Sequence, residues 1–160
     1  IRKHIPKQTS LTSDWNLVAA HPWWQMNDSI SSLMHTALTP EYILWRYRDN
    51  PNVSYQLLES SGERPFMVIY RKKKIGLFTE LRITDLLCQP ADVTHALSCL
   101  QGKESGAIIT VSGGNPEFLP KFLSIKAGPT VTIRNLNLPG WEENLTFDQW
   151  APSLGDLELF

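Results

Sequence analysis

Apolar residues recur at helical spacing in the first third of the chain and at strand spacing in its middle. After Asn27-Asp28 a helix of about ten residues is predicted from the helical period of its apolar positions: Ile30, Leu33, Met34, Ala37 and Leu38. A second helix is predicted from Thr39, which caps its first turn, and Pro40, which suits the first helical position. It ends at Asn50-Pro51, because proline disfavours the helical conformation in the residue before it.

The second predicted helix places several aromatic residues and an arginine on barely two turns. We expect it to dock on the core through its apolar face, with Trp45 and Tyr47 largely structural. Arg46 then extends its aliphatic stem past them and keeps its charge in solvent.

The segment before these helices is polar at first and then aromatic. Residues 1–14 predict an extended lead-in segment, and residues 15–20 fit either a strand or one helical turn. His21-Pro22 interrupts any helix, and in an extended chain the adjacent Trp23 and Trp24 point to opposite faces. One ring then suits the core, and the other suits a groove in which an aromatic platform binds a ligand.

Beyond Pro51 the period changes to that of β-strands. Residues 55–59, 66–71 and 75–88 are rich in β-formers and predict a three-stranded antiparallel meander. Turn-forming residues separate the first two strands, and the basic run 71–74 is predicted to be a solvated hairpin turn before the third. Strict alternation in the third strand places one set of residues on a single face: Leu77, Thr79, Leu81, Ile83, Asp85 and Leu87.

A helix and a further buried strand follow the meander. The helix begins at Pro90-Ala91-Asp92 and closes at Gln101-Gly102. Residues 107–111 form a continuous apolar run near glycines, as in a buried strand. A helix between two strands favours a right-handed parallel crossover. A last helix from Asn115 and strands at 130–135 and 154–160 complete the expected order.

The predicted fold class is therefore α+β. It is a mixed sheet in which an antiparallel meander precedes a parallel β-α-β step, with helices on both faces. Residues 1–27 are the extended lead-in segment and residues 28–160 the folded domain, which makes one domain overall. A chain of 160 residues is long enough to bury a core of its own.

Composition and charge exclude several partners and suggest a compartment. The net charge of −1 gives no electrostatic case for nucleic acid or for an anionic membrane, and no apolar stretch is long enough for a membrane helix. Cys88 and Cys99 have apolar neighbours, so we expect both to be reduced, buried side chains in a cytoplasmic protein. No group of histidines and cysteines has the spacing of a metal site, so no metal is expected.

Short motifs within this order of elements resemble the GNAT family of N-acetyltransferases. Tyr42-Ile-Leu-Trp-Arg-Tyr47 with Asn50-Pro51, the strand end Ile83-Thr-Asp-Leu-Leu87 and the closing Leu154-Gly-Asp156 are similar to the C-terminal half of acetyltransferase-like proteins found with bacterial polysaccharide genes. The resemblance covers most of residues 28–160. It implies the mixed GNAT sheet, an acyltransferase function, and a preceding N-terminal half that carries the acyl-CoA site.

The chain departs from the family at the CoA-binding loop. Family members hold the CoA pyrophosphate on backbone N–H groups of a glycine-rich loop that opens the helix after the fourth strand. The corresponding residues 87–95 contain no glycine, and Asp92 at the helix start would repel a pyrophosphate. We therefore expect no cofactor in this chain alone, with acetyl-CoA supplied by another domain.

The resemblance also places a ligand cleft between the ends of the fourth and fifth strands, where open α/β sheets bind ligands. The chain offers uncharged hydrogen-bonding residues there: Gln89, Ser112, Gly113, Gly114 and Asn115. They suit a small neutral polar ligand better than CoA, although Gly113-Gly114 also fits a plain turn. Asp85 is the candidate catalytic carboxylate, and a structural hydrogen-bonding role is its alternative.

Two functions from different classes remain open at this stage. The chain is either the second half of a larger acyltransferase, partnered by an N-terminal half or by a second copy, or a non-catalytic module that binds a sugar or a peptide. The six tryptophans favour the second, because aromatic platforms recognise sugars. Fold analogy alone does not choose between them.

Overall fold

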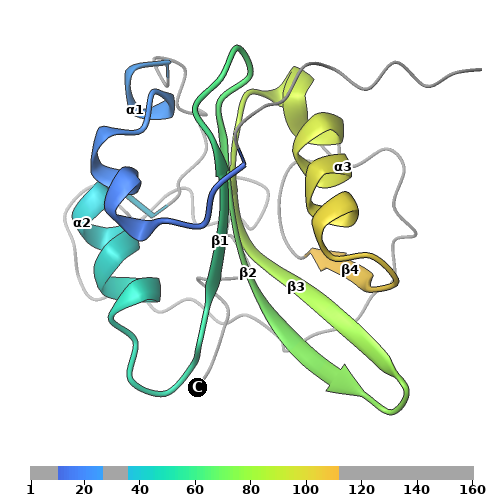
Figure 1. Cartoon of the computed structure of the whole chain (residues 1–160). Coiled ribbons are helices and arrows are strands. Elements are labelled where there is room, and N and C mark those ends of the chain that lie inside the picture. The colour runs from blue at the N-terminus through green and yellow to red at the C-terminus, as the bar shows by residue number, and fades with distance from the viewer. Residues whose placement is uncertain (1–10, 27–35, 112–160) are drawn as a thin grey trace, which may run out of the picture.

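The structure is a computed structural model that describes residues 11–26 and 36–111 (Figure 1). In these residues four strands lie in sequence order across one sheet: β1 (Gln56–Ser60), β2 (Phe66–Ile75), β3 (Phe78–Leu87) and β4 (Ile108–Val111). The first three are antiparallel neighbours, and β4 runs parallel to β3. This confirms the predicted α+β fold, with its antiparallel meander followed by a parallel step.

Helical segments cover both faces of the sheet, as predicted (Figure 1). On one face lie four short segments, the N-terminal helical group: η1 (Trp15–Ala20), α1 (Trp23–Met26), α2 (Pro40–Ile43) and η2 (Leu44–Arg48). On the other face α3 (Val93–Lys103) follows the short turn η3 (Pro90–Asp92). The helix predicted at 27–38 lies mostly outside the described residues, as do the later helix and strands, and residues 36–38 are not helical.

Two apolar cores sit on the two sides of the sheet. Residues of β1, β2 and β3 contact the N-terminal helical group through one core: Val18, Trp23, Ile43, Tyr47, Tyr55, Leu57, Met67, Ile69 and Leu87. Residues of the same strands contact α3 through the other: Leu58, Phe66, Val68, Tyr70, Leu81, Ile83, Ala96 and Leu100. Residues 66–70 are buried without interruption because both faces of β2 are covered at this level.

A β-bulge in β3 changes which residues face which core. Ile69 pairs with Asp85 while Tyr70 pairs with Ile83, so Thr84 has no partner in the ladder. The Thr84 hydroxyl donates a hydrogen bond to the carbonyl of Ile69 at 3.1 Å. The prediction of one continuous face in this strand is wrong, because the extra residue inverts the alternation. Ile83 therefore faces α3, while Asp85 faces the N-terminal helical group.

The basic run predicted as a turn belongs instead to β2. This strand continues to Ile75, which pairs with Phe78, and the turn consists of Gly76 and Leu77. Gly76 has a φ of 59°, which glycine adopts without steric cost. The lysines remain in the strand because this end of the hairpin extends past both cores, where both faces of a strand meet water.

The helix predicted from Thr39 is confirmed at its start and partly wrong in its buried face. The Thr39 hydroxyl accepts a hydrogen bond from the Tyr42 N–H at 3.1 Å, and Pro40 begins the helix. Its second half, η2, is a π-helical turn that ends before Asn50. Tyr47 is buried, but Trp45 is 65% exposed. Trp45 lies two residues from Tyr47, and such positions do not share a helix face.

The remaining predictions for the helical segments are partly confirmed. Of the two alternatives for residues 15–20, the helical turn is observed, with the Asp14 side chain accepting a hydrogen bond from the Asn16 N–H at 2.9 Å. The helix α3 continues through Gly102 to Lys103, slightly beyond the predicted close. Trp23 and Trp24 begin α1, so the prediction of an extended segment there is wrong.

Candidate functional site

The start of α3, the crossover helix that connects β3 to β4, is the place where a GNAT-type protein would hold CoA. Here the chain leaves β3 through Gln89, whose side-chain amide donates a hydrogen bond to the Met26 carbonyl at 3.1 Å. Pro90 has no N–H, the N–H of Asp92 donates to the Gln89 carbonyl at 2.9 Å, and the N–H of Val93 donates to the Pro90 carbonyl. Three of the four residues 90–93 therefore offer no free backbone donor to a ligand.

The charges at this helix start are also paired. Asp92 lies in the first turn, and its carboxylate oxygen is 3.6 Å from Nε of Arg64. The arginine comes from the β1–β2 connection, which reaches this end of the sheet because Met67 pairs with Leu87. Only uncharged hydrogen-bonding residues were expected to line a cleft near this position. The available signal was the hairpin itself. In an antiparallel pair the start of β2, which follows Arg64, must lie beside the end of β3.

Asp85 is buried against the N-terminal helical group. Its carboxylate accepts a hydrogen bond from the Tyr47 hydroxyl, and Tyr47 also contacts Tyr55 edge-on, with ring centroids 4.9 Å apart. Burial, followed by the charge of Asp85, raises the pKa of Tyr47, so its hydroxyl stays protonated and donates this bond. This geometry favours the structural role for Asp85, because a catalytic carboxylate must reach a substrate.

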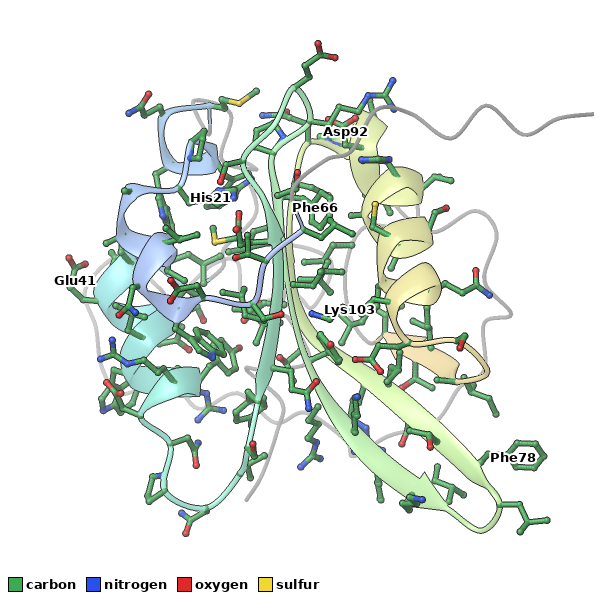
Figure 2. All side chains as sticks on the ribbon, viewed as in Figure 1. His21, Glu41, Phe66, Phe78, Asp92 and Lys103 are labelled. Carbon is green, nitrogen blue, oxygen red and sulfur yellow. The ribbon has the colours of Figure 1, made fainter. Side chains whose placement is uncertain are left out.

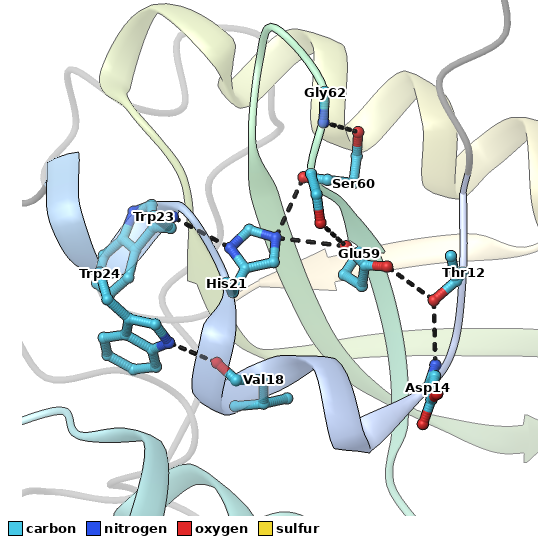
Figure 3. Close-up of polar contacts among 10 residues, drawn as sticks. Thr12, Asp14, Val18, His21, Trp23, Trp24, Glu59, Ser60 and Gly62 are labelled. Carbon is cyan, nitrogen blue, oxygen red and sulfur yellow. Dashed lines mark hydrogen bonds and ion pairs between the residues drawn. The ribbon is translucent and has the colours of Figure 1, made fainter.

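A second buried polar group, which we call the His21–Glu59 cluster, was missed by sequence analysis (Figure 3). His21 and Glu59 are both buried, and Nε2 of His21 lies 3.4 Å from Oε2 of Glu59. The other carboxylate oxygen of Glu59 accepts a hydrogen bond from the Thr12 hydroxyl at 2.7 Å, and Oε2 accepts one from Ser61 at 2.9 Å. The available signal was a glutamate next to the apolar residues of a predicted strand.

The contacts of the His21 ring fix its tautomer. Nδ1 accepts a hydrogen bond from the Trp23 N–H at 3.2 Å, so the neutral ring carries its proton on Nε2, which lies 3.1 Å from the Ser60 carbonyl. Burial lowers the pKa of His21, although the charge of Glu59 opposes this. The cluster joins the segment at Thr12, α1 and the end of β1. With both ring nitrogens bonded and the ring buried, it is suited to holding these segments together.

The burial of the tryptophans differs from the prediction of an aromatic platform at Trp23 and Trp24. Trp23 is buried, and Trp24 packs edge-on against it at 4.9 Å and donates its indole N–H to the Val18 carbonyl at 2.6 Å. Any platform at this pair is thus restricted to Trp24. Trp45 is the exposed tryptophan that sequence analysis placed in the core, and its ring lies 6.0 Å from that of Tyr42.

The remaining candidates are partly outside the described residues. Ser112, Gly113, Gly114 and Asn115 lie beyond them, so Gln89 is the described member of the predicted cleft. Cys88 and Cys99 are free and half-buried, and burial raises the pKa of Cys88 to about 12. In residues 11–26 and 36–111 no group of three or more metal-ligating side chains converges, and no helix is long and apolar enough to cross a membrane.

Comparison of the chain with protein-family models, with curated proteins and with solved structures finds no match in any of the three.

Proposed function

We propose that this chain is an acetyltransferase-like domain that leaves acyl-CoA binding to a second domain or subunit and contributes packing or acceptor contacts to it. The order of elements supports this proposal: an antiparallel meander, a crossover helix and a parallel strand, with helices on both faces. The motif resemblance in residues 42–51 and 83–87 adds to it. We place the domain in the cytoplasm, where the free Cys88 and Cys99 would stay reduced.

The observation that carries the proposal is the first turn of the crossover helix. A pyrophosphate at a helix start needs several free N–H groups and close backbone approach. At this position Pro90 lacks the donor, two following N–H groups are bonded within the turn, and the Asp92 carboxylate adds negative charge. The nearby Arg64 is already paired with Asp92. The turn therefore opposes a multiply charged CoA in both its hydrogen bonding and its electrostatics.

Calorimetric titration with acetyl-CoA and with CoA tests the proposal. We expect no saturable heat up to millimolar ligand with the chain alone. Replacing Pro90 and Asp92 by glycine should create some affinity for CoA. The first substitution introduces a backbone N–H at position 90, and the second removes a negative charge and the partner of Arg64. Gln101→Ala, on an exposed part of α3, is the control. Micromolar binding of acetyl-CoA by the unchanged chain would contradict the proposal.

One observation favours the second candidate, a carbohydrate-binding module. The exposed ring of Trp45 and the half-buried ring of Tyr42 form an aromatic pair on α2 and η2, inclined at 49°. Sugars stack their apolar faces on rings of this kind. Calorimetry with a panel of neutral oligosaccharides should then show binding that Trp45→Ala abolishes. Trp15→Phe, at a half-buried ring on η1, should leave such binding unchanged.

A further inference from the structure

The far end of the β2–β3 hairpin bears three exposed apolar side chains, which we call the apolar tip. Ile75 is 51% exposed, Leu77 100% and Phe78 61%. Figure 2 shows Phe78 at the end of the hairpin, pointing away from the helices on both sides of the sheet. Neither core includes these residues. These three side chains therefore lie outside both cores that the described residues form.

Basic residues flank the hairpin directly behind the tip, and we call them the basic collar: Lys72, Lys73, Lys74 and Arg82. Among the described residues, two carboxylates face the collar, since Glu104 lies 2.7 Å from Lys72 and Glu80 lies 3.0 Å from Arg82. Lys103, beside Glu104 at the end of α3, adds one more positive charge near this end of the sheet. Within residues 11–26 and 36–111 an excess of positive charge therefore remains here, although the whole chain has a net charge of −1.

We propose that the apolar tip inserts into the interface of an anionic lipid bilayer while the basic collar binds the lipid headgroups. Interfacial segments bury apolar side chains about 5–10 Å into the boundary between headgroups and acyl chains. A strand advances roughly 3.4 Å per residue, so Lys72 lies about 10 Å behind Ile75. Lysines at this distance from an inserted tip reach the headgroups, and their long stems allow the ammonium groups to remain there.

The size and charge of the surface favour a membrane over a second copy of the chain. The three side chains of the tip expose roughly 400 Å², about half of the area that each partner contributes to a standard protein interface. Two tips brought together would also oppose their basic collars at close range. An anionic bilayer needs no matching shape, and it attracts each lysine. This revises the expectation from net charge, because the charge that matters is local to the hairpin.

Vesicle sedimentation with the whole chain tests the proposal. The vesicles contain phosphatidylcholine alone or with about one-third phosphatidylserine. We expect binding only to the phosphatidylserine vesicles, and its loss in high salt. The double variant Lys73→Gln/Lys74→Gln should bind about 25-fold more weakly, since each lysine at an anionic surface contributes about fivefold. Leu77→Ser/Phe78→Ser should bind at least tenfold more weakly.

Leu17→Ser is the matched control, because Leu17 is an exposed leucine on η1, away from the hairpin, and its substitution should leave binding unchanged. Thermal melting of each variant checks folding. The collar variant tests binding of the headgroups, and the tip variant independently tests insertion of the apolar side chains. Absence of binding to the phosphatidylserine vesicles overturns the proposal, as does equal binding to both vesicle types. A dimer of the unchanged chain that the tip variant dissociates would assign the tip to a second copy and would also overturn it. None of these results depends on CoA binding.

Discussion

The two faces of the sheet are covered in different ways. Among the residues that the structure describes, one face is covered by a single helix of 11 residues, α3, which packs through Ala96 and Leu100 on a core made of apolar side chains and Tyr70. On the other face four helical segments of four to six residues cover a core that also includes the Tyr47–Asp85 hydrogen bond and the His21–Glu59 cluster. Burial of charged groups is thus concentrated where the helices are short.

This difference has a physical reason. Isolated helices of one or two turns are unstable in water, and each presents too few apolar residues to define its own position. A buried hydrogen bond to a charged group adds direction, because its geometry is restricted and an unpaired partner is costly. We infer that the polar contacts set the positions of the short segments. By contrast, α3 is positioned mainly by the shape of its apolar side, and its polar contacts to β2 are made by Glu104 at its C-terminal end.

The largest effect is expected from the apolar face. Leu100→Ala removes a fully buried side chain between α3 and the sheet, and we expect the free energy of unfolding to fall by about 2–5 kcal/mol, the usual cost of such a cavity. Denaturant unfolding measures this, with the exposed neighbour Gln101→Ala as the control. A loss below about 1 kcal/mol would show that α3 is not held by its apolar packing.

The Tyr47–Asp85 bond is the next test, because it joins η2 to the sheet. Tyr47→Phe keeps the ring but removes the donor to a buried carboxylate, and we expect a loss of about 1–3 kcal/mol in the free energy of unfolding. The informative measurement is a double-mutant cycle with Asp85→Asn. A coupling energy of at least about 0.5 kcal/mol is expected. Additive effects of the two substitutions would mean that this bond does not position η2.

The His21–Glu59 cluster should make the stability of the same face depend on pH. Burial lowers the pKa of His21 below its ordinary value of 6.5, so the unfolded chain binds a proton more readily than the folded one. The contribution of His21 is therefore fully present above pH 6.5 and is lost as pH falls toward its folded pKa. Protonation of Nδ1 would also oppose the N–H of Trp23, which donates to it.

Unfolding measured between pH 7 and pH 5 should show a fall in stability on the order of 1 kcal/mol that is specific to His21. His21→Asn is the comparison, because asparagine can accept the Trp23 bond but does not titrate in this range. Hydrogen bonds from Thr110 and Arg82, against the opposing effect of burial, lower the pKa of Glu80 from an ordinary 4.5, so its contribution changes at lower pH. If the free energy of unfolding changed equally with pH in the unchanged protein and in His21→Asn, the proposed effect of His21 would be excluded.

Local signals predicted much of this fold. The Thr39 cap, the strands of the meander and the helix after Pro90 depend on neighbouring residues, and the structure contains all of them. The β-bulge at Thr84 depends on the register with β2, so strict alternation in one strand did not reveal it. The error at residues 71–74 has the same origin, because lysines form a strand when the partner strand continues beside them.

The candidate site was harder to predict for the same physical reason. Glu59 and His21 lie far apart in the chain, and so do Arg64 and Asp92, so each pair forms only through the tertiary fold. Asp85 could be identified as a buried carboxylate from its apolar surroundings, but its partner Tyr47 lies on another element. Periodicity indicates which residues are buried, whereas the pairing of polar groups follows from how the elements are arranged.

The smallest effect is expected at Trp45, and it is the sharpest test of how η2 is oriented. The ring is 65% exposed, and its centroid lies 6.0 Å from that of the partly buried ring of Tyr42. Trp45→Ala should therefore change the free energy of unfolding by no more than about 0.5 kcal/mol, as surface substitutions do. Ile43→Ala, two residues earlier on the buried side, is the matched comparison and should cost about 2–5 kcal/mol. If the two substitutions had similar large effects, η2 would be rotated from the orientation that buries Tyr47, and the Tyr47–Asp85 bond could not form.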